Sequence, residues 1–162
     1  MKRFFTFLFV FLFLAYGAYA NDLRLSGLDV VSVNTSANTM IFKVDVSQKN
    51  GWRNTVSHDA AWIFLKYSTD AGQTWDHATM AGIGKDPAGF STTSGYEIVV
   101  PQDQKGFFLR RNVMTSGDVT AEGVRFTWNY GVDGLSDETV QAANTLTHLF
   151  GVEMVYIPEG AF

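Results

Sequence analysis

The sequence predicts an all-β fold, an antiparallel β-sandwich of about eight strands in one domain with at most one short helix. Three observations favour it. Short apolar segments follow one another along the chain, and clusters of Gly, Asn, Asp, Ser and Pro separate them. Several segments alternate apolar and polar residues, as half-buried strands do. Helical patterns do not alternate with the strands, which argues against a parallel α/β sheet.

The central strand is predicted at residues 60–68, inside the apolar run from Asp59 to Tyr67. This run is almost continuously apolar, so neither of its faces can meet water, and we expect cover on both sides. Turn-forming residues flank it on both ends. We therefore expect Trp62, in the middle of the run, to lie in the core.

Seven further strands complete the predicted sandwich. In 40–46, Met40, Phe42, Val44 and Val46 share one face, and in 123–130 the residues Val124, Phe126, Trp128 and Tyr130 point inward. Ser26-Gly27 predicts a bulge or a kink in the first strand. The seven segments are residues 23–33, 40–46, 74–78, 96–100, 107–111, 123–130 and 145–157.

Two stretches between the strands have other predicted structures. Residues 82–95 are rich in Gly, Ser and Thr and are expected to form a loop. Residues 137–144 are the one helix expected, with Ser136 as its N-cap and Asp137 and Glu138 in its first turn.

The N-terminus has the pattern of a signal peptide. Lys2-Arg3 precede an apolar segment at 4–14, and Ala18-Tyr19-Ala20 forms an A-x-A cleavage site. The apolar segment is shorter than the roughly 20 residues that a membrane-spanning helix needs. We expect cleavage after Ala20, export to the periplasm or the cell exterior, and no membrane attachment afterwards.

Charge and cysteine content exclude several functional classes. The chain has a net charge of −4, and removal of a signal peptide with Lys2 and Arg3 makes the remainder more acidic. An acidic protein without a basic stripe does not suit nucleic acid or anionic membranes. Because the chain has no cysteine, thiolate nucleophiles, Cys-ligated zinc and iron–sulfur clusters are excluded.

No metal site, cofactor or catalytic residue is predicted. His58, His77 and His148 show no recognisable ligand spacing, and no Ser-His-Asp order or phosphate-binding loop is present. The acidic stretch 133–138 has either of two roles, a calcium loop or a polar turn followed by a helix cap, and the second is favoured. Arg110 and Arg111 are adjacent in a strand, so they point to opposite faces and form no joint clamp.

A weak candidate for ligand binding is the set of Trp52, Trp75 and His77. Both tryptophans lie near turns, where an aromatic ring can serve as an exposed platform for a sugar, whereas Trp128 lies within a regular alternation and is expected in the core. A packing role for Trp52 and Trp75 is still favoured, because large aromatic side chains dominate core burial.

Two stretches resemble exported bacterial proteins of the formylglycine-generating enzyme (sulfatase-modifying factor) family. Gly51-Trp52-Arg53, residues 59–67, Trp75, His77-Ala78 and 126–131 resemble an N-terminal β domain found in such proteins. Residues 152–162, Val-Glu-Met-Val-Tyr-Ile-Pro-Glu-Gly-Ala-Phe, look like the opening strand of the family's enzymatic domain, which starts roughly Met-Val-x-Ile-Pro-x-Gly-x-Phe.

The resemblance implies a signal peptide at 1–20, an accessory β-sandwich at 21–151, and at 152–162 the opening strand of an enzymatic domain truncated before its catalytic region. Family members convert a cysteine of sulfatases to formylglycine with copper and a cysteine pair, and other branches use non-haem iron. Those centres lie beyond the opening strand, so the resemblance transfers no catalytic residue and no cofactor.

The implied function is that of a non-catalytic exported accessory or interaction domain. Its expected partner is a downstream enzymatic domain, oxidoreductase-like in the full-length relative, or another exported protein. The alternative is a self-standing secreted binding module, with carbohydrate as the candidate ligand and Trp52 and Trp75 as the residues that contact it.

Overall fold

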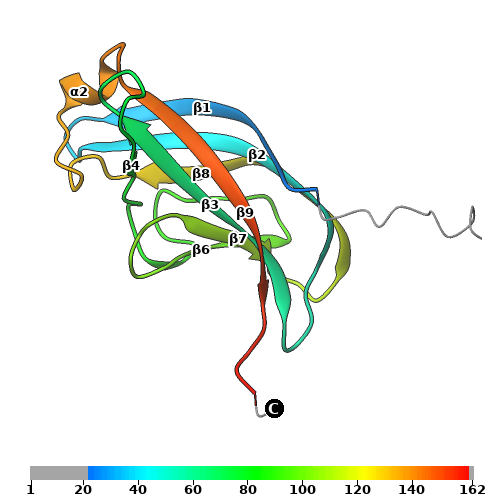
Figure 1. The fold of residues 1–162 in the computed structure, drawn as a ribbon. Helices are drawn as coiled ribbons and strands as arrows, with labels where there is room; N and C mark the ends of the chain where they lie inside the picture. Colours follow the sequence, from blue (N-terminus) through cyan, green and yellow to red (C-terminus); the bar gives the residue numbers. More distant parts are fainter. Residues whose placement is uncertain (1–21, 161–162) are drawn as a thin grey trace, which may run out of the picture.

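The computed structural model describes residues 22–160, which form two antiparallel β-sheets packed face to face (Figure 1). The first sheet has the order β1-β2-β8. The second has the order β4-β3-β7-β6-β5, and β9 pairs with the remaining edge of β3. Every paired strand is antiparallel, so the predicted all-β sandwich is confirmed. The strands are β1 (Arg24–Asn34), β2 (Thr39–Trp52), β3 (His58–Ser68), β4 (Asp76–His77), β5 (Gly84–Lys85), β6 (Tyr96–Val100), β7 (Phe107–Arg111), β8 (Ser116–Trp128) and β9 (Leu146–Tyr156).

The predicted strands are all present, and β5 is a ninth, two-residue strand inside the expected loop at 82–95. β2 and β8 extend well beyond their predicted bounds because they pair with each other from Met40–Trp128 to Trp52–Ser116. The expected bulge in β1 is also found, since the register of β1 against β2 shifts between Ser26 and Asp29.

The inner faces of the two sheets form one core, as the alternation predicts. Met40, Phe42, Val44 and Val46 of β2 are buried, while Lys43 and Asp45 between them are exposed. On β8, Val124, Phe126 and Trp128 are buried, and Tyr130 follows them into the core. Phe126 stacks on Phe42 and contacts Phe107 of the second sheet, with ring centroids 5.3 Å and 5.2 Å apart.

The expectation that both faces of the central strand are covered is only half right. Ala61, Ile63 and Leu65 of β3 point into the core and are buried. Trp62 and Phe64 point to the opposite side of the sheet and are only partly buried. The placement of Trp62 in the core is therefore wrong, because the two-residue period of the strand assigns it to the face that the other sheet does not cover.

The helix α2 (Asp137–Gln141) is shorter than the predicted segment 137–144 but begins as expected. Ser136 is its N-cap, and the Ser136 hydroxyl accepts a hydrogen bond from the Thr139 amide at 3.2 Å. Within residues 22–160, no helix has the length and apolar character that crossing a bilayer requires. The predicted signal peptide lies outside the described residues.

β9 runs without interruption across the expected domain boundary between residues 151 and 152. All its residues from Leu146 to Tyr156 are in register with β3, from Ser68 to His58. Residues 152–156 are therefore paired in the sheet of the sandwich.

The difference between the core and the far side of β3 predicts different costs of truncation. Phe126→Ala removes a fully buried ring and is expected to lower the free energy of unfolding by about 3–5 kcal/mol. Trp62→Ala removes a partly buried ring and should cost roughly 1–2 kcal/mol. Urea denaturation of both variants measures the difference, and equal costs would contradict the assignment of Trp62 to the outer side.

Candidate functional site

The side of the second sheet that points away from the first sheet is called here the outer face. Strand register determines its members, because directly paired residues lie on the same face of a sheet. On β3, Trp62 pairs with Phe108 and Val152, and Phe64 pairs with Phe150. The outer face comprises His58, Ala60, Trp62, Phe64 and Lys66 of β3, His77 of β4, Glu97 and Val99 of β6, Phe108 and Arg110 of β7, and His148, Phe150, Val152, Met154 and Tyr156 of β9.

Apolar side chains on the outer face are open to solvent. Phe150, Val152, Met154 and Tyr156 of β9 are 43%, 42%, 41% and 53% exposed. β9 runs along the front of the molecule in Figure 1, and no helix or strand of the described chain lies across it. Scattered exposed apolar residues are normal in proteins, but a contiguous strip of them marks a surface that another molecule covers.

Aromatic rings form a continuous row along one part of this face. Phe64 is central, with ring centroids 4.6 Å from Trp62, 5.3 Å from Phe150 and 5.2 Å from His77. The row continues through His148, whose ring centroid lies 4.5 Å from that of Trp75. The aromatic row is therefore Trp62, Phe64, His77, Phe150, His148 and Trp75.

The structure brings together two of the three predicted site residues. Trp75 and His77 both belong to the aromatic row, and the Trp75 ring is held by a hydrogen bond from its Nε1 to the Gly72 carbonyl at 3.1 Å. Trp52 lies elsewhere, at the end of β2, where its amide donates to Asp59 Oδ2 at 3.2 Å. Asp59 marks the position of Trp52 on β3, and Lys66, which pairs with His77, marks the position of the other two residues. Asp59 and Lys66 are seven residues apart, which corresponds to about 23 Å along the strand. Trp52 thus shares no site with the other two.

Phe64, Phe150 and His148 are not among the site residues that the sequence predicts. Their signal was present in the continuous apolar character of the run around Phe64, which has large apolar residues at both odd and even positions. That pattern predicts cover on both faces of β3. The described chain supplies cover for one face only, and the second apolar face becomes the exposed surface.

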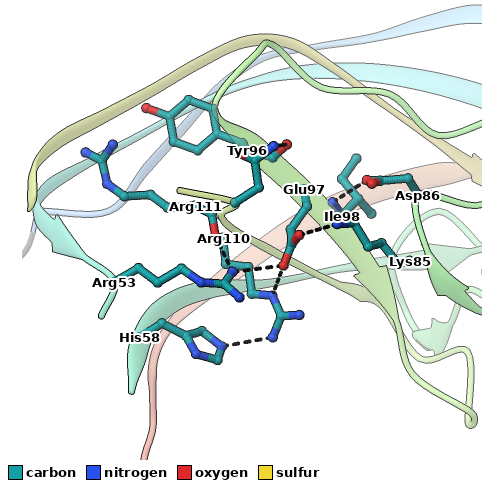
Figure 2. A network of polar contacts seen from close by, with 10 residues as sticks. Arg53, His58, Lys85, Asp86, Tyr96, Glu97, Ile98, Arg110 and Arg111 are labelled. Atoms are coloured by element: carbon teal, nitrogen blue, oxygen red, sulfur yellow. Dashed lines mark hydrogen bonds and ion pairs between the residues drawn. The ribbon is translucent and has the colours of Figure 1, made fainter. Parts of the chain in front are cut away.

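A buried carboxylate organises the end of the outer face nearest β6 and β7. The Glu97 side chain is 4% exposed and receives three cations (Figure 2). Its Oε1 accepts from Arg53 Nη1 at 2.9 Å and from Arg110 Nε at 2.6 Å, and its Oε2 pairs with Lys85 Nζ at 2.7 Å. Burial alone would raise the pKa of Glu97, but the hydrogen bonds from Lys85, Arg53 and Arg110 outweigh it and lower the pKa to about 2.

His58 is the neighbour of this cluster. Arg110 Nη1 lies 2.9 Å from His58 Nε2, and since a guanidinium can only donate, Nε2 accepts. Burial lowers the pKa of His58, and the positive charges of Arg110 and Arg53 lower it further. The imidazole of His58 is therefore neutral at pH 7.

Arg110 and Arg111 bind separate partners, as their opposite orientation predicts. Arg110 turns to Glu97 on the outer face, whereas Arg111 Nη2 donates to the carbonyls of Gly117 and Asp118, each at 2.8 Å. The predicted orientation of the two side chains to opposite faces of β7 is confirmed.

The acidic stretch 133–138 uses its carboxylates within the protein. Asp133 accepts from the Thr79 amide at 3.0 Å, from the Thr79 hydroxyl at 2.6 Å and from Trp128 Nε1 at 2.7 Å. Asp137 accepts from the Tyr130 hydroxyl. These contacts support the turn-and-cap interpretation. Within the described part of the chain, no group of three or more His, Asp or Glu side chains is placed to hold a metal ion.

Comparison with known proteins gives no relative: no protein-family model, no curated protein and no solved structure matches this chain. The family resemblance proposed from the sequence motifs therefore stays a prediction, and the geometry of the outer face is the available guide to function.

The ion cluster predicts a defined pH dependence of stability. Glu97→Gln leaves three cations without their counter-charge and should lower the free energy of unfolding by roughly 3 kcal/mol at pH 7. The folded-state pKa of Glu97 lies below its ordinary value, so its stabilisation is present above pH 4.5 and is lost as the pH falls from 4.5 toward 2. Urea denaturation across this pH range should show the difference between wild type and variant shrinking.

The exposed Glu122 of β8 provides the matched control for this experiment. Glu122→Gln removes the same charge at a solvated position of the first sheet and should change stability little at any of these pH values. A pH-independent deficit in Glu97→Gln would show that the cluster acts through packing rather than through the ionised carboxylate.

Proposed function

We propose that this protein is a non-catalytic interaction domain that docks a second folded unit on its outer face. The observation that carries the proposal is β3, the strand that is apolar on both faces but covered by the described chain on one only. Burying exposed apolar surface is the dominant favourable term in protein association. A partner on the outer face would supply the second cover that the sequence of β3 requires.

The composition of the outer face supports a protein partner. Aromatic residues, Met and Arg are enriched in the cores of protein interfaces, and Lys, Glu and Asp are depleted there. Phe150, Met154 and Tyr156 lie on the exposed strand β9, next to Trp62 and Phe64 on β3. The charged residues Glu97 and Arg110 lie at one end, where they are paired with each other.

The partner we propose is an enzymatic domain of the formylglycine-generating enzyme type, in the same polypeptide or in another exported protein. Support comes from the resemblance of residues 152–162 to the opening strand of that domain, together with the export signal expected at residues 1–20. In this assignment the oxidoreductase-like chemistry belongs to the partner. This chain contributes a docking surface, in the periplasm or outside the cell.

Two steps test the docking function. The genomic sequence after Phe162 should continue in frame into the remainder of an enzymatic domain of this family. In the continuous protein, Phe150→Glu places a charge in the proposed interface and is expected to split one calorimetric unfolding transition into two, because the docked domains unfold together and the undocked ones separately.

Val30→Glu is the matched control. Val30 lies on β1 of the first sheet and is 54% exposed, so the same charge is introduced at a similarly exposed apolar position away from the outer face. This variant should keep one transition. A reading frame that encodes an unrelated fold would contradict an enzymatic domain of this family in the same polypeptide, and a single transition in Phe150→Glu would contradict docking on the outer face.

The aromatic row favours a second candidate function, a binding module for carbohydrate. Rings of Trp75, His148 and Phe150 line up on an open sheet face, an arrangement on which a sugar ring can stack. Since Trp52 lies at the far end of β3, Trp75 and His77 are the two predicted site residues that this alternative keeps.

A glycan array with the wild type, Trp75→Ala and Trp52→Ala examines this second candidate. Sugar binding should fall at least about tenfold in Trp75→Ala, as expected for loss of an aromatic platform, and stay unchanged in Trp52→Ala. Equal binding by all three proteins, or none by the wild type, would remove the carbohydrate function.

A further inference from the structure

A groove opens at the His58 end of the outer face, between β3, β7 and β9. Its volume is about 220 Å³. Apolar side chains form most of its wall, and Arg110 and His58 contribute its polar groups. The apolar wall consists mainly of Ala60, Val99, Phe108 and Met154, and Tyr156 closes one side, its ring stacked on that of His58 at 5.0 Å.

Arg110 is fixed in this groove and still has hydrogen-bonding capacity. Its Nε donates to Glu97 and its Nη1 to His58, which sets the orientation of the guanidinium. Its Nη2 has no hydrogen-bond partner among residues 22–160, and Figure 2 draws this nitrogen free of dashed lines. A guanidinium held by two bonds and open at its third nitrogen is preorganised to receive an acceptor.

The ion cluster beside the groove has a net positive charge. Arg53, Lys85 and Arg110 contribute three positive charges against the single negative charge of Glu97, a local excess of two on a chain of net charge −4. Both oxygens of Glu97 are already occupied by these cations. Of the described residues, none that lines the groove carries a carboxylate.

We propose that this groove binds a small amphiphilic carboxylate, an anion that carries a short alkyl chain or a single ring. The carboxylate accepts a charge-assisted hydrogen bond from Arg110 Nη2. The apolar part lies against Ala60, Phe108 and Met154, where its burial provides the hydrophobic share of the binding free energy. Neutral His58 holds the guanidinium in place without adding charge.

This site goes beyond the docking function, because described residues of this chain form it completely and no partner is needed to test it. A cationic or neutral amphiphile of equal length would find the same apolar wall but no counterpart for its head group. Selectivity for a negatively charged head group therefore distinguishes the proposed site from a non-specific apolar surface.

The experiment titrates the purified protein with hexanoate, hexylammonium and hexanol, following amide chemical shifts of β3, β7 and β9 by NMR. Hexanoate is expected to bind saturably and at least about tenfold more tightly than the other two probes, since only it gains the charge-assisted bond. Arg110→Gln should abolish this preference.

Two further variants keep the result interpretable if Arg110→Gln disturbs folding. Ala60→Leu fills the groove while every charged residue of the ion cluster stays in place, and it should weaken hexanoate binding at least about tenfold. Lys43→Gln removes one positive charge from an exposed ion pair on β2 and should leave binding unchanged. Thermal unfolding of each variant confirms that it is folded.

Several results would overturn the proposal. Equal binding of the three probes, no saturable hexanoate binding, or full binding by a folded Ala60→Leu variant would each do so. A Gly-Gly-Leu tripeptide with a free terminal carboxylate serves as a fourth probe. Should it bind at least about tenfold more tightly than hexanoate, the groove would be reassigned from a small-molecule site to a site for a polypeptide terminus.

Discussion

The sandwich depends on the pairing of β3, which has a partner strand on both edges. β9 pairs with all eleven of its residues, while β7 and β4 share the opposite edge. The inner side chains Ile63 and Leu65 are fully buried against the first sheet. Because β3 determines the register of its three neighbours, it also determines which side chains gather on the outer face.

The same register explains why apolar and charged groups meet at one end of the outer face. Ala60 pairs with Arg110, and Arg110 pairs with Glu97 on the next strand. A buried carboxylate is costly unless cations and hydrogen bonds compensate for its lost hydration, and Arg53, Lys85 and Arg110 do so here. The cluster thus fixes the guanidinium that borders the apolar groove.

The alternation of apolar and polar residues predicts the buried face of a strand correctly wherever the other face is exposed to solvent. The alternation in β2 and β8 identified the inward residues Phe42, Val44, Phe126 and Trp128, and the sequence order Arg110-Arg111 was enough to separate the two side chains. It failed at Trp62, where large apolar residues occupy both faces and periodicity cannot tell the inner face from the outer.

Sequence by itself determined the all-β class, the positions of the strands and the inner face of each alternating strand, because these follow from the two-residue period of a strand and from turn chemistry. Only the tertiary structure decided which residues meet across strands. Glu97 and Arg53 are 44 residues apart, and His58 and Tyr156 are further separated still, yet each pair is in contact. Strand order and register place them together, and neither is written in the local pattern of a single strand.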